Sequence, residues 1–182
     1  ALSCVVSAGV CPFIDMGVWQ PHGTRVERAQ KFKNYIPDGE GGQRMCEMPG
    51  APDLDTWLQC WAVFRTAGIM DNLADSATLD RYADQFEKNC RMYSGSWRIC
   101  ASADIICRTE QWPELRRRLE AFHATSPALS SFDPQQPWNA VIKDSVGQMA
   151  FEFWDEELKE PCRSSLLYWG PARVAGGGEP QP

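Results

Sequence analysis

Apolar positions recur at helical spacing through the middle of the chain, and this pattern predicts a mainly α-helical protein. In residues 53–72 one apolar stripe follows i, i+3, i+4, i+7 spacing. Residues 76–93 place apolar and charged side chains on opposite faces, the clearest amphipathic pattern in the sequence. Residues 97–109 are apolar almost all round, which is typical of a central helix. We expect the core of these three packed helices to contain Trp57, Trp61, Phe64, Tyr82, Phe86 and Trp97.

Local signals predict where the first two helices begin and how closely they approach. Asp53 follows the Pro49-Gly50-Ala51-Pro52 break and suits an N-cap, and Ser76 suits the N-cap of the second helix. Gly68 lies on the apolar stripe, where the lack of a side chain lets a neighbour approach closely.

Further helices are expected towards the C-terminus. Trp112-Pro113 predicts the start of a fourth helix, because proline is tolerated in the first turn. Residues 125–136 read as an irregular crossing segment, after which Pro137 opens another helix. Residues 149–160 continue helically until Pro161, which we expect to bend or stop the helix.

The N-terminal part has a different pattern. Residues 31–36 and 43–48 flank a segment rich in glycine and acidic residues, which predicts a small β-hairpin. The expected organisation is an N-terminal extension (1–17), an irregular segment with the hairpin (18–52), a helical domain (53–169) and a flexible tail (170–182). The fold class is therefore mainly α: a compact bundle of five to six helices with an N-terminal β-hairpin and a disordered C-terminal tail.

Composition narrows the class further. The chain has 182 residues, of which 43% are hydrophobic, enough for a sizeable core. Charges interrupt every apolar run well before the roughly 20 residues of a membrane-spanning helix, so no membrane span is expected. The chain has no initiating Met and its first ten residues lack the features of a secretory signal, so we interpret it as a fragment or a processed product. The eight cysteines include four within helical patterns, which favours reduced, structural thiols and an intracellular, reducing compartment, cytoplasmic or nuclear.

The charge balance argues against nonspecific binding to nucleic acid. The net charge is −6, whereas phosphate neutralisation needs clustered Lys and Arg. The basic cluster at residues 116–118 spreads over different faces of a helix and reads as a solvated surface. Contact with RNA is not excluded, but no pattern supports it.

No pattern of residues marks a catalytic or cofactor site. Cys4 with Cys11 and Cys100 with Cys107 are each seven apart, which is not a zinc spacing, so no metal or cofactor is expected. A cysteine nucleophile needs a histidine base, and His22 and His123 both read as surface residues.

One acidic residue stands out because it lies in the most apolar helix. If buried, Asp104 needs a partner, and Arg108 one turn later is the simplest one. This pattern predicts a structural ion pair.

A series of motifs in a fixed order along the chain resembles a known protein family, although no single motif is diagnostic. The motifs are Pro49-Gly50, Trp57-x-x-Cys60-Trp61-x-Val63-Phe64-Arg65, Leu79-Asp80-x-Tyr82, Trp97, Asp104, Arg108-x-Glu110, Pro137-Trp138-Asn139 and Phe153-Trp154. Together they resemble a family of dinoflagellate proteins that look like the gag-like, capsid-like portion of retroelement polyproteins. The resemblance spans about residues 18–169. It implies a helical scaffold that acts by self-association. The sequence holds neither the basic segment nor the Cys-rich knuckle that commonly follows in the family, so RNA packaging by this chain alone is not expected.

The expected function is therefore a non-enzymatic assembly module whose partner is protein, either itself or a larger complex. Eight tryptophans exceed the need of one small core, and the candidate interface residues on the outer helices are Trp112, Trp138, Trp154 and Trp169. The alternative for each is that it closes the core of the domain. A second hypothesis is an adaptor that docks into a complex through the hairpin or residues 166–169. A third is an enzyme with an unfamiliar thiol at Cys11 or Cys46.

Overall fold

The computed structural model describes residues 11–12, 31–37, 43–93 and 97–168, and this part of the chain is mainly helical. The prediction of a mainly α protein is confirmed. The expected tail at residues 170–182, and the N-terminal extension apart from Cys11 and Pro12, lie outside the described residues. The expected turn at residues 38–42 does so as well.

The first two helices form an antiparallel pair whose ends are set by aspartate caps. Helix α2 (Leu54–Met70) begins after Asp53, whose carboxylate accepts a hydrogen bond of 2.7 Å from the Thr56 amide. Helix α3 (Ser76–Met92) has Asp75, rather than the predicted Ser76, at its N-cap. Asp75 accepts a 2.6 Å bond from the Thr78 amide, and an ionised carboxylate is the better acceptor at the positive end of a helix.

The tight connection between α2 and α3 uses Gly68 as the sequence predicted. A Cβ atom built on Gly68 would lie 3.2 Å from Cδ2 of Leu73 and 3.6 Å from Cδ1 of Leu79. Asn72 has a positive φ of 54° and reverses the chain between the helices. Leu73 is fully buried, so the missing side chain of Gly68 makes room for the connection to fold back onto α2.

The predicted fourth helix does not start separately at Trp112. Helix α4 (Trp97–Ile106) runs through a π-helical turn (Cys107–Gln111) directly into α5 (Trp112–Thr125). The amide of Trp112 donates to the carbonyl of Cys107, five residues back. This wider turn explains how the helix continues into Pro113, which has no N–H to donate and would otherwise crowd the carbonyl four residues earlier.

The same type of turn recurs before Pro161, where the helix does not stop as one alternative of the prediction had it. Helix α6 (Pro137–Ser145) leads through a 3-10 turn (Gln148–Ala150) into α7 (Phe151–Trp154). A π-helical turn (Asp155–Lys159) then joins α7 to α8 (Glu160–Tyr168), and the Glu160 amide donates to the Asp155 carbonyl. In both places the π-helical turn ends two residues before the proline, and the helix continues beyond it.

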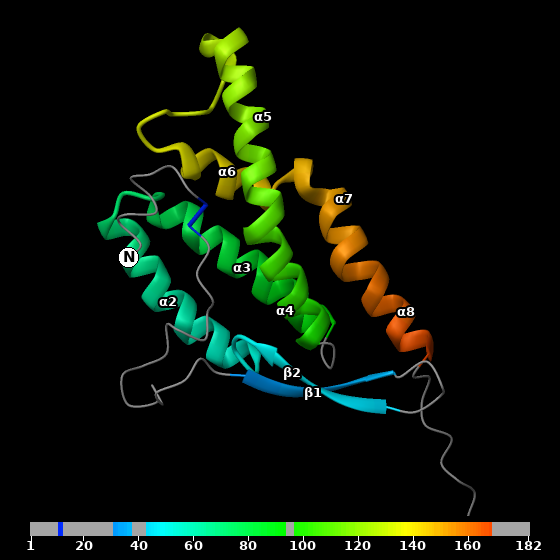
Figure 1. Cartoon of the computed structure of the whole chain (residues 1–182). Coiled ribbons are helices and arrows are strands. Elements are labelled where there is room, and N and C mark those ends of the chain that lie inside the picture. Colours follow the sequence, from blue (N-terminus) through cyan, green and yellow to red (C-terminus); the bar gives the residue numbers. More distant parts are fainter. Residues whose placement is uncertain (1–10, 13–30, 38–42, 94–96, 169–182) are drawn as a thin grey trace, which may run out of the picture.

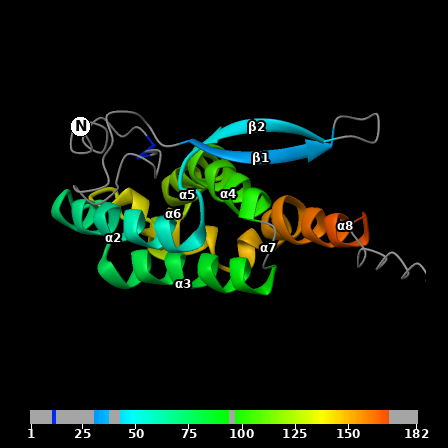
Figure 2. The same cartoon turned by 90° about the horizontal axis from the view of Figure 1, so that it is seen from below.

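These helices form five continuous helical runs in the described part of the chain, and Figures 1 and 2 show how they lie. Helices α2 and α3 lie side by side, α4 and α5 form one long rod across them, and α7 with α8 forms an arm on the side away from α2. Strands β1 (Lys31–Pro37) and β2 (Gln43–Pro49) pair in antiparallel fashion and lie along one side of the helices. A short 3-10 turn (Pro127–Leu129) lies between α5 and α6.

The centre of the core is a set of aromatic rings from α2, α3 and the α4–α5 rod. Trp57 stacks on Trp61 with ring centroids 5.0 Å apart, and Trp61 stacks on Tyr82 at 4.9 Å. Phe86 lies 4.4 Å from Trp57, and Trp112 meets Tyr82 edge-on at 5.5 Å. Such pairs add roughly 0.5–1.5 kcal/mol each to the free energy of burial. The aromatic residues therefore tie α2, α3 and α5 into one core.

Candidate interaction surface

Three of the four candidate interface tryptophans are buried within the chain. Trp112, Trp138 and Trp154 expose 0%, 1% and 4% of their surface, while Trp169 lies outside the described residues. The indole N–H of Trp112 donates to the Ser145 hydroxyl, and that of Trp154 to the Ser145 carbonyl at 2.7 Å. These three tryptophans therefore close the core of the domain and do not form an exposed interaction surface.

The expected core residues lie together at the centre of the molecule. Five of them are almost fully buried, and Trp97 is half-buried, with its indole N–H donating to the Ala51 carbonyl at 2.9 Å. The five are Trp57, Trp61, Phe64, Tyr82 and Phe86. These side chains are therefore occupied by packing and are not free to contact a partner.

The predicted ion pair between Asp104 and Arg108 is confirmed, and it is almost fully buried. The two side chains expose 2% and 1% of their surface, and the shortest bond, Arg108 Nη2 to Asp104 Oδ2, measures 2.6 Å. The carboxylate also accepts the Trp57 indole N–H at 3.0 Å and the Tyr82 hydroxyl at 2.9 Å. Both oxygens of the Asp104 carboxylate therefore accept hydrogen bonds from buried groups of the protein. This arrangement is typical of a structural ion pair that links α2, α3 and α4.

The buried surroundings of this ion pair keep the neighbouring Tyr82 hydroxyl and Cys107 thiol protonated. Burial, reinforced by the Asp104 carboxylate, raises the pKa of Tyr82 well above its usual range. Burial also raises the pKa of the Cys107 thiol to about 12. Neither group ionises at neutral pH, so neither is a nucleophile there.

The surface that the helical pattern leaves uncovered is the outer face of α2. We define it by Ala62, Val63, Thr66, Ala67 and Met70, which together line a shallow, open depression. Met70 is 81% exposed, and the neighbouring Ile69 is 40% exposed. Within the part of the chain that the structure describes, no other helix or strand covers these residues.

The outer face of α2 is also free of charge. From Thr56 to Met70 the helix carries a single charged residue, Arg65. Its guanidinium donates two hydrogen bonds to the Asp80 carboxylate on α3, at 2.5 and 2.8 Å, and this contact lowers the pKa of Asp80. Even the Thr66 hydroxyl is satisfied, since it donates to the Ala62 carbonyl at 3.0 Å. The sequence signal for this face was the low charge of residues 56–70, where Arg65 is the single charged residue.

The thiol and histidine candidates do not converge on a reactive site. The Cys11 thiol donates to the Arg108 carbonyl at 2.9 Å, and the side chain of Cys46 lies outside the described residues, as does His22. His123 packs its ring 5.7 Å from that of Phe132. Cys90, Cys100 and Cys107 are buried free thiols.

The described part of the chain also holds no arrangement of three or more His, Cys, Asp or Glu side chains that could bind a metal ion. Among the helices that the structure describes, none is long and apolar enough to span a membrane.

Comparisons of the chain with protein-family models, with curated proteins and with solved structures find no match. The resemblance to the gag-like family therefore rests on the sequence motifs.

Proposed function

We propose that the chain is a non-enzymatic assembly module that self-associates through the outer face of α2. The observation that carries this proposal is that the outer face of α2, from Ala62 to Met70, consists of small and apolar side chains, and that the one charged residue of this stretch, Arg65, is paired with Asp80. The resemblance to gag-like, capsid-like scaffolds supports the same class of function.

The charge of the chain favours a second copy as the occupant of this face. Two copies that each carry a net charge of −6 repel one another, and the repulsion is weakest where the touching surfaces carry no charge. The small side chains of Ala62, Thr66 and Ala67 let two helix backbones approach closely. Val63 and Met70 on the same face supply the apolar area that drives association.

The size of the face sets the expected strength. A helix of 17 residues is about 25 Å long, so two crossed α2 helices bury less than the roughly 1,200 Å² of a standard stable complex. We therefore expect a weak, reversible contact that becomes visible only at high protein concentration.

The test is the solution mass of the chain by light scattering across a concentration series that reaches about 1 mM. Thr66→Glu and Thr66→Lys each place a charge at the centre of the face. Both residues have a higher helix propensity than threonine, so neither change should weaken α2 itself. Both variants should stay monomeric, and mixing them should restore association, because opposite charges then meet across the contact.

Leu129→Lys is the matched control, since it places a lysine at a residue that is 81% exposed on a different element. This variant should associate as the parent chain does. A parent chain that stays monomeric throughout the series would refute the proposal. Equal association of the Thr66 variants and the control would also refute it, by moving the contact away from α2.

The second candidate is an adaptor that docks into a larger complex. The same exposed face would then bind a different protein, and the chain would be monomeric alone. Repeating the mass measurement with single-stranded RNA at low salt tests whether RNA promotes assembly, which the net charge of −6 does not favour.

A further inference from the structure

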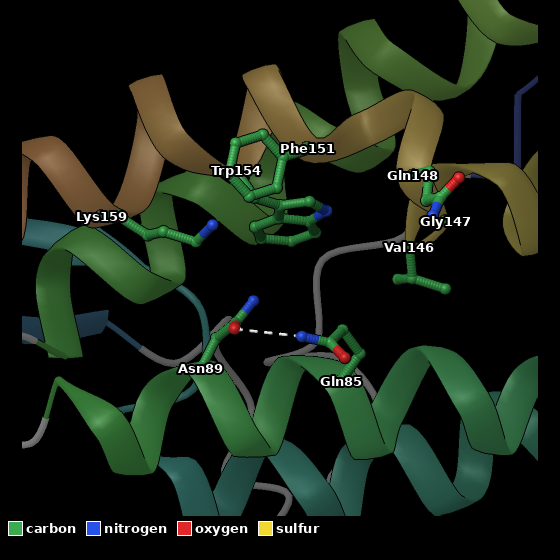
Figure 3. Close-up of a pocket in the computed structure, with 8 residues that line it drawn as sticks. All are labelled: Gln85, Asn89, Val146, Gly147, Gln148, Phe151, Trp154 and Lys159. Atoms are coloured by element: carbon green, nitrogen blue, oxygen red, sulfur yellow. Dashed lines mark hydrogen bonds between the residues drawn. The ribbon is translucent and has the colours of Figure 1, made fainter.

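A second feature of the surface is a pocket of about 530 Å³ between α3 and the segment that runs from the end of α6 into α7 (Figure 3). Its volume lies within the usual range for ligand sites. Gln85 and Asn89 line it from α3, and Phe151, Trp154 and Lys159 line it from the opposite side. The pocket thus brings amide, aromatic and cationic groups together from elements far apart in the sequence.

Asn89 is the polar group that is fixed most firmly. It is only 5% exposed, and its Oδ1 accepts a 3.1 Å hydrogen bond from Nε2 of Gln85. This bond determines the orientation of the amide, so the Nδ2 group points across the pocket towards Trp154 (Figure 3). No other described residue accepts a hydrogen bond from Nδ2, which leaves two N–H donors directed into the pocket.

Lys159 supplies a positive charge from the opposite side. Its ammonium lies 4.0 Å from the ring centroid of Phe151, and its side chain is only 19% exposed. The nearest acidic group is Asp155, whose Oδ1 lies 3.7 Å from Nζ. At that distance the pair is an ion contact with little hydrogen-bond character, so the ammonium retains donors for another acceptor.

The apolar wall of the pocket combines one fixed ring with one exposed ring. The indole of Trp154 is held by its hydrogen bond to the Ser145 carbonyl, while the ring of Phe151 is 61% exposed. A ligand that covers the Phe151 ring removes apolar surface from water, and the edge of Trp154, which is only 4% exposed, forms the back of the pocket. The wall therefore selects for an apolar body, and the donors select for an acceptor at one end of it.

We propose that this pocket binds a carboxylate attached to an apolar group, with Lys159 and Asn89 donating to the carboxylate and Trp154 and Phe151 packing against the apolar body. A carboxylate has two oxygens that accept from several donors at once, which matches an ammonium and an amide. A dianion such as a phosphate monoester is disfavoured because the Asp155 carboxylate lies beside the single cation. Two sources carry this chemistry: the C-terminal apolar residue of a peptide, and a small free acid.

The test is titration of the chain, labelled with nitrogen-15, with acetyl-Gly-Gly-Leu, with its C-terminal amide and with acetyl-leucine. Resonances of the Asn89 side-chain amide and the Trp154 indole N–H report on the pocket directly. Both acids should bind, and the amide should bind at least tenfold more weakly, since one charge-assisted hydrogen bond is worth about 1.5 kcal/mol or more. Tighter binding of the tripeptide than of acetyl-leucine would assign the site to peptide C-termini, and equal binding to small acids.

Two substitutions with opposite expected effects sharpen the test. Lys159→Gln should weaken acid binding about tenfold, because it removes the cation. Asp155→Asn should strengthen binding, because it removes the competing carboxylate. Lys143→Gln removes an exposed lysine of α6 that does not line the pocket and should change nothing.

Equal binding of the acid and the amide would overturn the proposal, and so would unchanged affinity in Lys159→Gln. The Thr66→Glu variant should bind the acids as the parent chain does, because α2 does not line this pocket. The pocket and the self-association proposal can therefore fail independently.

Discussion

The buried tie between Asp104 and Arg108 allows a quantitative test of the structure. Replacing Arg108 by methionine keeps an unbranched apolar side chain but removes the guanidinium. The carboxylate of Asp104, which is 2% exposed, then retains only the two neutral donors of Trp57 and Tyr82. Removing one partner of a buried ion pair leaves an uncompensated charge, so we expect Arg108→Met to lower the free energy of unfolding by about 3–5 kcal/mol.

The double variant separates charge from packing. Changing Asp104 to leucine together with Arg108→Met removes both charges. The Trp57 indole and the Tyr82 hydroxyl then lose the Asp104 carboxylate as their acceptor, which should lower the free energy of unfolding by roughly 1–3 kcal/mol for each group. The two single changes should therefore sum to considerably more than the double change, with a coupling energy of at least about 2 kcal/mol.

The assay is urea denaturation followed by circular dichroism and by tryptophan fluorescence, with equal m values for all variants. Arg65→Met is the matched control, because it breaks an ion pair between two helices in a solvated position and should leave stability nearly unchanged. A loss below about 1 kcal/mol for Arg108→Met, similar to that of the control, would refute the argument that a charge is left buried without a partner.

Three further predictions concern the helices and their buried groups. Gly68→Leu should lower the free energy of unfolding by about 2 kcal/mol or more, because the new side chain meets Leu73 at the helix connection, whereas Gly68→Ala should be tolerated; chemical denaturation compares the two. Asp75→Ala should lower the free energy of unfolding by about 1 kcal/mol, because it removes the N-cap of α3. The hydrogen bond from the Thr78 amide lowers the pKa of Asp75, so this stabilisation should be present above about pH 4 and be lost as the pH falls. Denaturation of the parent chain and the variant between pH 2 and 7 measures this difference. Cys107 should make the protein less stable at alkaline pH. The pKa of its thiol is about 12 in the folded chain and 9.0 ordinarily, so the thiol ionises first in the unfolded chain, and the free energy of unfolding falls by about 1.4 kcal/mol per pH unit between these values. Cys107→Ala should reduce this slope, which denaturation at a series of alkaline pH values measures.

Much of the helical architecture follows from local chemistry, and for that reason the sequence predicts it well. Leu79, Tyr82 and Phe86 lie three or four residues apart, and all three are fully buried on one face of α3. Asp53 caps α2 as predicted, and the partner of Asp104 is the arginine one turn away. In each case the interaction lies within a few residues of sequence.

The errors arise where a single-residue preference or a helix period does not decide the outcome. Proline at positions 113 and 161 was interpreted by its local preference, yet a preceding π-helical turn carries the helix past both residues. Periodicity shows which side of a helix is apolar but not what that side meets. Trp138 and Trp154, on outer helices, therefore could not be assigned to the core from the sequence.

The two candidate surfaces were missed for related reasons. The outer face of α2 consists of residues that look like core residues, and only the packed structure shows that no other described element covers them. The pocket joins Asn89 of α3 to Lys159 near the far end of the chain, and no spacing rule connects residues so far apart. The sequence held one hint of the α2 face, the low charge of residues 56–70, where Arg65 is the single charged residue.

A weak contact through α2 is compatible with a role in assembly. A face of this size gives low affinity between free copies, so a single contact cannot hold a dilute chain together. When several copies are held on one surface or one larger chain, each contact becomes intramolecular, and the effective concentration rises to the millimolar range. The same weak face then supports a stable array, and one charge at Thr66 should dissolve the array far more completely than it affects any single pair, because every contact in the array uses that position.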